Sequence, residues 1–167
     1  PSIEAITTMG NKMAARKLAL QADAPVIPGT TEPLGNIKDA QKTADNIGYP
    51  LLIKAAGGGG GKGMRIIHSK KDMKEAIHRA KSEAKKAFSD SRIYIEKYLE
   101  KPHHIEIQIF SDNHGNTVSL GERECSIQRR YQKIIEETPS PFIDARLRTA
   151  LEQSALQITR ACKYSGA

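Results

Sequence analysis

The chain has 167 residues, 38% apolar and 27% charged, and no apolar run approaches the roughly 20 residues that span a bilayer. This composition is typical of a globular domain with a buried core, so we expect neither disorder nor a membrane-spanning helix. The formal net charge is +7, and positions 134–167 contain four basic and four acidic residues, so the whole excess lies in positions 1–133 and favours an anionic partner.

The first elements are predicted to be helices separated by a loop. Apolar residues at turn-like spacing predict a helix over 8–22, with Thr8 as its N-cap. The stretch 24–36 is rich in Pro and Gly and is typical of a linker or domain boundary. Apolar residues every three or four positions predict a second helix over 37–47, closed by Gly48.

A glycine tract between two strands comes next. The short apolar run 50–55 predicts a strand, the tract follows at 57–61, and a second strand is expected at 64–68. A helix is then predicted over 69–88, and its inward-facing residues are expected to be Met73, Ile77, Ala80, Ala84 and Phe88.

The second half is richer in strands. Alternation predicts strands at 92–99, 104–110 and 117–122, the last two joined by a hairpin loop. In 104–110 the isoleucines lie on one face and Glu106 with Gln108 on the other. Positions 125–142 are expected to be irregular, with a short strand near 133–137. An amphipathic helix over 144–164 ends the chain, with an inner stripe of Leu147, Leu151, Ile158 and Cys162.

The glycine tract is the most informative segment. Each ordered Gly costs about 0.5–1 kcal/mol relative to Ala, so the six glycines at 57–61 and 63 forgo about 3–6 kcal/mol. That is a large part of the roughly 5–15 kcal/mol by which a domain is stable. Close approach of backbone N–H groups to a phosphate chain explains such a tract, and a flexible hairpin tip is the alternative.

The surroundings of the tract exclude the commoner phosphate-binding loops. A Walker A loop would need Gly at 56 and Ser or Thr at 63, where this chain has Ala56 and Gly63. A Rossmann pattern is matched trivially by polyglycine, but a strand rather than a helix follows. In protein kinases the phosphate-contacting lysine follows the glycine-rich loop, whereas Lys54 precedes the tract. The order strand, lysine, glycine flap, strand indicates a hairpin that folds over a triphosphate.

Seven motifs in one collinear order then carry a family resemblance. They are MGNK, VIPG, IGYPLLIKAAGGGGGKGMR, EAKKAF, IEKYLE, HHIEIQIFSDNHGN and ERECSIQRRYQKIIEETPSP. Together they resemble the biotin carboxylase family of ATP-grasp enzymes. Carbamoyl-phosphate synthetase shares the first motif and the glycine flap, but the last motif is similar to biotin carboxylase alone. The resemblance implies an α+β fold, an ATP-grasp fragment.

The resemblance also implies a domain organisation and a reaction. Residues 1–25 would link into the ATP-grasp, 26–98 would form its glycine-flap lid, and 99–167 would begin the core subdomain. The reaction would be ATP-dependent carboxylation of biotin by bicarbonate through carboxyphosphate. The implied partners are ATP, bicarbonate, a biotinylated carrier and a carboxyltransferase component, with a homodimer for the full-length protein.

By the same resemblance, several residues bind ATP. Lys12 and Lys54 contact its phosphates, and the flap contributes the amides of Gly60 and Gly61. One side chain and two backbone groups hold the adenine edge, from the run Glu96, Lys97, Tyr98 and Leu99.

The implied chemical residues follow in the second half. His104 and Gln128 lie around the ribose and phosphates. Lys133 is the implied catalytic residue, because its ammonium suits bicarbonate and the transferring γ-phosphoryl group. Tyr131 departs from the family pattern, since many members have a nucleotide-contacting His there; Tyr can donate and stack but carries no positive charge at pH 7.

The cofactors implied are ATP with Mg²⁺ or Mn²⁺, and biotin as a carrier-bound substrate. The family's magnesium carboxylates and its biotin-handling arginine lie beyond Ala167. The chain begins at Pro1 without an initiator Met and stops just after a helix, so we expect an excerpt of a larger protein. Without the metal ligands we expect no carboxylase turnover from the excerpt.

Several of these residues also have other interpretations. Glu106 is either a site carboxylate or a solvated one, and Cys125 is expected to pack. Arg129 and Arg130 would otherwise read as a nucleic-acid patch. At the level of the whole chain, the competing functions are another ATP-grasp ligase and a non-catalytic nucleotide- or nucleic-acid-binding module. Aromatic residues make up only 5% of the chain with no Trp, which disfavours stacking of single strands.

The cysteines bear on the cellular setting. Cys125 and Cys162 are the only two, and they form no CxxC pair. A disulfide scaffold and a cysteine zinc site are therefore not expected. The N-terminus lacks the pattern of a secretory signal. We expect a cytoplasmic protein, or a mitochondrial matrix protein if it is eukaryotic.

Overall fold

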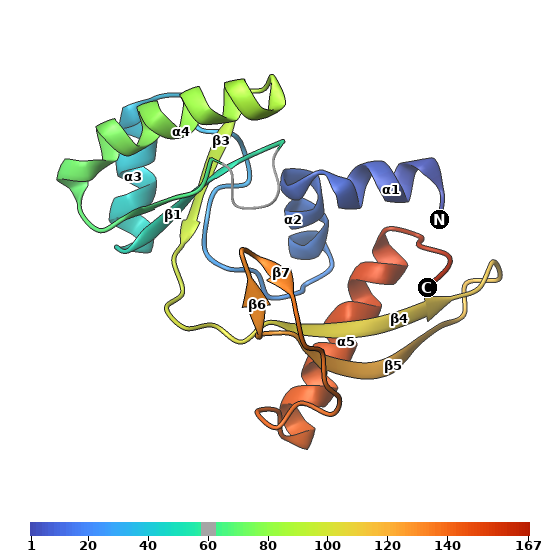
Figure 1. Cartoon of the computed structure of the whole chain (residues 1–167). Helices are drawn as coiled ribbons and strands as arrows, with labels where there is room; N and C mark the ends of the chain where they lie inside the picture. Colours follow the sequence, from blue (N-terminus) through green and yellow to red (C-terminus); the bar gives the residue numbers. More distant parts are fainter. Residues whose placement is uncertain (58–62) are drawn as a thin grey trace. The chain divides into compact units, whose positions relative to one another are not determined.

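The computed structural model describes residues 1–57 and 63–167 (Figure 1). The predicted flap residues Gly60 and Gly61 lie outside the described residues. The described elements are α1 Ile3–Gly10, α2 Lys12–Gln21, α3 Ile37–Ile47, β1 Leu51–Ala55, β2 Arg65–Ile67, a 3₁₀ turn Lys70–Asp72, α4 Met73–Phe88, β3 Ile93–Lys97, β4 Ile105–Ser111, β5 Thr117–Glu124, β6 Gln128–Arg129, β7 Gln132–Lys133 and α5 Ala145–Ala161.

The chain divides into two compact units. One contains residues 11–13 and 27–100 and is called here the three-stranded unit. The other contains residues 1–10, 14–26 and 101–167 and is called the hairpin unit. No helix among the described residues is long and apolar enough to cross a membrane.

The three-stranded unit is an antiparallel sheet in the order β2-β1-β3, with α3 and α4 packed on it (Figure 1). The strand period of two points alternate residues to the same face. Leu51, Ile53 and Ala55 of β1 therefore join Ile93 and Ile95 of β3 in the fully buried core beneath the helices. The predicted inward stripe of α4 is confirmed, with Phe88 partly buried against the same core.

The ends of α3 follow the predicted chemistry. The Asn36 side chain accepts the amide of Asp39 at 3.0 Å and caps the first turn. The helix ends at Gly48, whose φ of 77° and ψ of 152° belong to a region that is essentially restricted to glycine. Its amide donates to Ala44 O at 2.8 Å, so the predicted closing glycine is confirmed.

The Pro- and Gly-rich stretch 24–36 is more ordered than a linker. Its middle runs along β3 through a bridge between Gly29 and Glu96 and through a 2.8 Å hydrogen bond from the Leu34 amide to Ile93 O. A Cβ on Gly29 would lie 2.7 Å from Ile95 O, so only glycine permits this approach. The composition gave no sign of the pairing, because it satisfies backbone groups far along the chain.

The hairpin unit is built on the β4–β5 pair, against which α5 packs. The register shifts between Ile107 and Ile109, so two β5 residues lie opposite one β4 residue, and Gly121 there has a φ of 89°. The bulge lets Ser119 and Glu122, three positions apart, both contact α5. Ser119 Oγ donates to Glu152 at 3.2 Å, and Arg148 donates to Glu122 at 2.6 and 2.8 Å.

Three local predictions are wrong. The helix expected over 8–22 is two helices, α1 and α2, because Asn11 interrupts it and its side chain accepts the Met13 amide at 3.0 Å as α2 begins. Thr8 lies inside α1 and is therefore not the N-cap that was expected. The strand expected near 133–137 is instead β7, which pairs with β6 in a small hairpin. Leu147 is 47% exposed rather than part of an inner stripe of α5.

Candidate functional site

The predicted site residues form two clusters, one in each unit. In the three-stranded unit, the alternation that buries Ile53 places Lys54 on the opposite face of β1, away from the helices. Leu52 pairs with Glu96, and Lys54 pairs with Tyr94, so Lys54 and Glu96 are diagonal neighbours across β1 and β3. They form an ion pair in which Glu96 is 7% exposed.

Lys12 belongs to the same electrostatic cluster. Burial lowers its pKa below the usual lysine value, the charge of Lys54 lowers it further, and Glu96 partly opposes the shift. The Lys12 and Lys54 ammonium groups therefore both act on the Glu96 carboxylate, on the face of the sheet opposite α3 and α4. Such a surface favours an anionic ligand.

The run after β3 is anchored by its backbone and by one lysine. The amides of Lys97 and Tyr98 donate to Pro28 O at 2.7 Å and Pro50 O at 3.1 Å. Within the described part of the chain, the Leu99 amide has no hydrogen-bond acceptor. This leaves one backbone donor of the predicted adenine segment available to a ligand.

The Lys97 side chain has a structural partner that the sequence did not indicate. Its ammonium donates to Gly48 O at 3.2 Å and Tyr49 O at 2.7 Å, and so fastens the turn between α3 and β1 to β3. A role for Lys97 toward a ligand therefore rests on its backbone.

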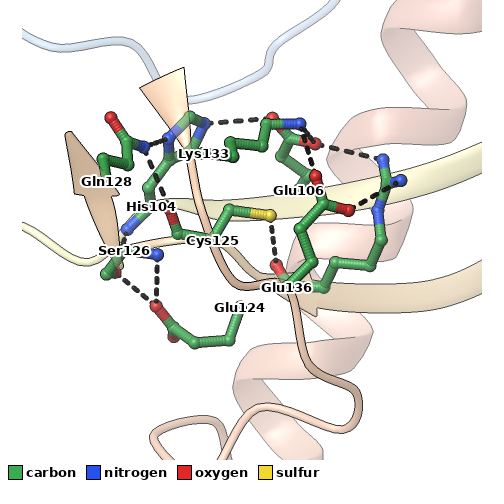
Figure 2. A network of polar contacts seen from close by, with 9 residues as sticks. His104, Glu106, Glu124, Cys125, Ser126, Gln128, Lys133 and Glu136 are labelled. Atoms are coloured by element: carbon green, nitrogen blue, oxygen red, sulfur yellow. Dashed lines mark hydrogen bonds and ion pairs between the residues drawn. The ribbon is translucent and has the colours of Figure 1, made fainter. Parts of the chain in front are cut away.

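The hairpin unit holds the second cluster, centred on Glu106 of β4 (Figure 2). Lys133 Nζ lies 2.6 Å from Glu106 Oε2 and 3.3 Å from Glu136 Oε1. Arg123 lies opposite Glu106 in the β4–β5 register, 3.0 Å from Oε2, and also contacts Glu136 at 3.4 Å. Two carboxylates and two cations thus form a compact square. Glu106 is thus held in ion pairs, and its role as a site carboxylate stays a prediction.

His104 and Gln128 are brought together beside this square (Figure 2). Gln128 Nε2 hydrogen-bonds to His104 Nδ1 and donates to Cys125 O at 2.9 Å, while His104 Nε2 lies 3.1 Å from Glu106 Oε1. The His104 amide donates to Ser126 Oγ at 2.8 Å. Both ring nitrogens of His104 therefore have a polar partner, which fixes the orientation of the ring.

The charge state of the square follows from its hydrogen bonds. The Lys133 ammonium lowers the pKa of Glu106, and Glu106 in turn raises the pKa of Lys133, so both stay ionised at neutral pH. Burial is the main cause that raises the pKa of the Cys125 thiol, and this residue is fully buried. Cys125 is thus a packing residue, as expected.

Tyr131 lies at the tip of the β6–β7 hairpin. Arg130 and Tyr131 form its two-residue turn, with φ values of 52° and 63°, and both left-handed positions are typical of a type I′ turn. The Tyr131 side chain is 68% exposed. The side chain for which a nucleotide contact is predicted is therefore accessible, at the tip of the turn.

Sequence reasoning missed three members of this cluster, Arg123, Ser126 and Glu136. A signal for two of them existed. Pairing the predicted strands would have placed the opposite charges of Glu106 and Arg123 across from one another, and Glu136 follows Lys133 by three positions. Ser126 had no such signal, because it acts through the backbone of His104.

Three carboxylates of the hairpin unit already have basic, hydroxyl or amide partners. Glu106 is engaged by Lys133 and Arg123, and Glu122 by Arg148 and Ser140. Glu124 accepts from Ser126 and Ser140. No group of three or more metal-ligating side chains occurs within residues 1–57 and 63–167.

The fold and these clusters define an ATP-grasp ATP-binding domain. The chain belongs to the family described as carbamoyl-phosphate synthase L chain, ATP binding domain, whose model matches residues 11–167. Within that family it is of the biotin carboxylase type found in biotin-dependent carboxylases. The predicted α+β ATP-grasp fragment and the predicted relationship are both confirmed.

Three relatives carry this conclusion. The pyruvate carboxylase of Staphylococcus aureus is 47% identical over the whole chain, which spans 14% of that protein. A biotin carboxylase–βγ-ATP complex from Campylobacter jejuni matches with a TM-score of 0.94 and 45% identity over 99% of this chain and 37% of that one. The biotin carboxylase domain dimer of a Hydrogenobacter thermophilus 2-oxoglutarate carboxylase, with MgADP, ADP and bicarbonate, matches with a TM-score of 0.89 and 38% identity. The match covers 96% of this chain and 35% of that one.

Proposed function

We propose that the protein containing this chain carboxylates biotin with ATP and bicarbonate, and that this chain supplies part of its ATP-binding domain. The observation that carries the proposal is the Lys133 ammonium, held between Glu106 and Glu136 and kept protonated by them. A fixed cation is what the joining of bicarbonate to a phosphoryl group requires, because negative charge must be stabilised on both reactants.

The nucleotide is proposed to bind through the three-stranded unit. Lys12 and Lys54 neutralise its phosphates, and Gly60 and Gly61 contribute flap amides. The adenine edge is met by Glu96 and by backbone groups of Lys97, Tyr98 and Leu99. The unused amide of Leu99 and the closeness of the Lys12 and Lys54 charges support this assignment. The lid would comprise residues 26–98, with 1–25 leading into it and 99–167 beginning the core subdomain.

Residues of the hairpin unit are proposed to complete the chemistry. His104 and Gln128 orient each other toward the ribose and phosphates, and Tyr131 contributes a hydroxyl in place of the family's usual His. Lys133 binds bicarbonate and stabilises the γ-phosphoryl group as it leaves ATP and joins a bicarbonate oxygen. ADP departs, the carboxyl group of carboxyphosphate passes to a biotin nitrogen, and the proton of that nitrogen goes to the phosphate that is released.

Further components are proposed to come from outside the 167 residues. They are the ligands of Mg²⁺ or Mn²⁺, the biotinylated carrier and the carboxyltransferase component, in a full-length homodimer. The H. thermophilus relative is a dimer with MgADP and bicarbonate, which supports this composition. The chain alone is therefore proposed to lack turnover, and bicarbonate-dependent ADP release by the 167-residue chain would overturn that point.

The test of the function uses the full-length parent. Lys133→Gln should lower biotin-stimulated, bicarbonate-dependent ADP release about 100-fold, since a fixed transition-state charge is lost. Arg146→Gln, an exposed cation on α5, is the matched control and should keep full activity. Unchanged turnover in Lys133→Gln would contradict the assignment. Bicarbonate-dependent ADP release that ignores biotin would instead favour another ATP-grasp ligase.

A further inference from the structure

A groove between α3 and α4 lies on the side of the three-stranded unit away from Lys54. It has a volume of ≈ 600 Å³, within the range of pockets that hold small ligands. Its lining residues are Leu34, Asn36, Ile37, Lys38, Lys74, Ile77, His78 and Lys81. None of them belongs to the proposed nucleotide or bicarbonate sites, so the groove is independent of the proposed function.

The floor of the groove is aliphatic. Leu34 and Ile77 are 8% and 6% exposed and belong to the core of the unit, and Ile37 is partly buried against the same core. Ile77 comes from the middle of α4, while Leu34 and Ile37 come from the segment that enters α3. The floor is therefore anchored in the packed core, and its shape does not depend on exposed side chains.

The rim is basic and has no counter-ions. Lys38, Lys74, His78 and Lys81 surround the floor, and none of the four is in an ion pair with any described residue. On α4 the positions 74, 77, 78 and 81 share one face, because they are three or four apart. Long lysine side chains bend along apolar surfaces and keep their ammonium in water, which frames the floor with positive charge.

The acidic side chains on and next to α4 are bonded outside the groove, and Asp39 of α3 is not among its lining residues. Asp72 accepts from Ser69 Oγ at 2.7 Å, Glu75 pairs with Arg79, and Glu83 pairs with Arg65 of β2. No acidic side chain lines the groove. Its electrostatic complement is therefore an anion from outside the unit.

We propose that this groove binds a small, water-soluble amphiphilic anion, an alkyl chain that ends in a phosphate or carboxylate. The alkyl chain lies on Leu34, Ile37 and Ile77, and the head group meets the lysines of the rim. Three aliphatic side chains suit one alkyl chain better than a docked helix, which uses an apolar stripe of four or so anchors. A free ligand is chosen over a lipid surface because the chain has no Trp to anchor at a bilayer interface.

The test titrates the 167-residue chain with octyl phosphate and follows the methyl signals of Leu34, Ile37 and Ile77 by NMR. Octyl glucoside has the same tail without the charge, and inorganic phosphate has the charge without the tail. Each should bind about tenfold more weakly than octyl phosphate, since each lacks one half of the recognition. Equal affinity for either probe would overturn the proposal.

Paired variants test the rim. Lys74→Gln with Lys81→Gln should weaken octyl phosphate binding about fivefold, because two favourable charge contacts are removed. Lys85→Gln with Lys86→Gln removes the same charge from exposed positions of α4 outside the groove and should change nothing. Equal weakening in both pairs would overturn the proposal. Methyl shifts that follow protein concentration alone would also overturn it, because they would assign the groove to contacts between copies of the chain. Circular dichroism confirms that each variant is folded.

Discussion

Individual lysines of this chain have different tasks according to their partners. The Lys97 ammonium donates to two backbone carbonyls and holds a turn, and the Lys133 ammonium is held and kept protonated by two carboxylates. Lys54 pairs with Glu96, and both charges act on Lys12. All three strand lysines look alike in sequence. Their chemistry is decided by whether a backbone carbonyl, a carboxylate or a second ammonium is the neighbour.

The lowered pKa of Lys12 predicts a pH dependence of nucleotide binding. Because burial and Lys54 disfavour its charged form, raising the pH from neutral deprotonates Lys12 before an ordinary lysine with a pKa near 10.5. ADP affinity of the full-length protein should therefore fall about tenfold as Lys12 loses its proton, which is the scale of one charged hydrogen bond. A fluorescent ADP analogue titrated across this pH range measures the change.

Lys12→Arg is the informative variant, since arginine stays protonated throughout. It should flatten the alkaline decline, while Lys42→Arg, at an exposed position of α3, should leave it as in the unaltered protein. An identical decline in Lys12→Arg would show that another group controls the binding.

At the scale of elements, single backbone positions decide how helices and strands meet. Gly48 ends α3 in a conformation reserved for glycine, and its carbonyl receives the Lys97 ammonium from β3. Gly29 brings its segment within reach of β3 in the same unit. These glycines set the geometry of the sheet edge and thus of the Glu96–Leu99 run.

Gly48→Ala should destabilise the three-stranded unit by about 2 kcal/mol, because alanine at a φ of 77° and ψ of 152° is strained. Urea unfolding of the chain measures the loss. Gly57→Ala is the comparison, since its Cβ would meet its nearest neighbour at 3.4 Å, an ordinary contact, and its φ is not left-handed. If both variants lost the same stability, the strain at Gly48 would not be the cause.

The contact between β5 and α5 predicts a response to acid. Two hydrogen bonds from Arg148 lower the pKa of the buried Glu122 to about 2, below its ordinary value of 4.5. A depressed carboxyl pKa stabilises the fold above the ordinary value, and this stability is lost as the pH falls from 4.5 toward 2. Glu122→Gln should cost about 2 kcal/mol at neutral pH and remove this part of the acid dependence.

Urea unfolding at several pH values in this window measures both effects. Glu4→Gln, an exposed carboxyl in α1 of the same unit, should retain the full acid dependence. A Glu122→Gln variant that loses stability on acidification as steeply as the unaltered chain would assign the effect to other carboxyls.

At the scale of the whole molecule, charge and division into units are the main features. The net charge of +7 lies entirely before position 134. The three-stranded unit carries the cluster of Lys12 and Lys54 on one face of its sheet and the basic groove between α3 and α4 on the other. The chain spans only a minor part of the relatives it matches. The proposed function therefore belongs to the larger protein, and anion binding is the property to test in this part.

Salt should weaken ADP binding by the full-length protein, since part of the attraction is long-range and is screened beyond about 8 Å at physiological ionic strength. Lys54→Gln should lower both the affinity and the slope of its logarithm against salt. Lys85→Gln, exposed on α4, should lower neither by a comparable amount. Equal slopes for the two variants would contradict a local role for Lys54.

The sequence by itself determined the family, the fold class and most element positions. Apolar spacing located α3, α4, β1 and β4, and residues with special backbone chemistry, such as Asn36 and Gly48, marked their ends. Such signals are local, because caps and periodicity act within a few positions. The collinear motifs supplied the biotin carboxylase type that the comparisons confirm.

Only the tertiary structure decided which charges share a partner. The diagonal pairing of Lys54 with Glu96, the square around Glu106 and the edge pairing at Gly29 depend on strand register between distant positions. The break at Asn11 was missed because a local side-chain bond outcompeted a continuous apolar spacing. Register and packing are settled by the sum of many long-range contacts, so no local spacing contains them.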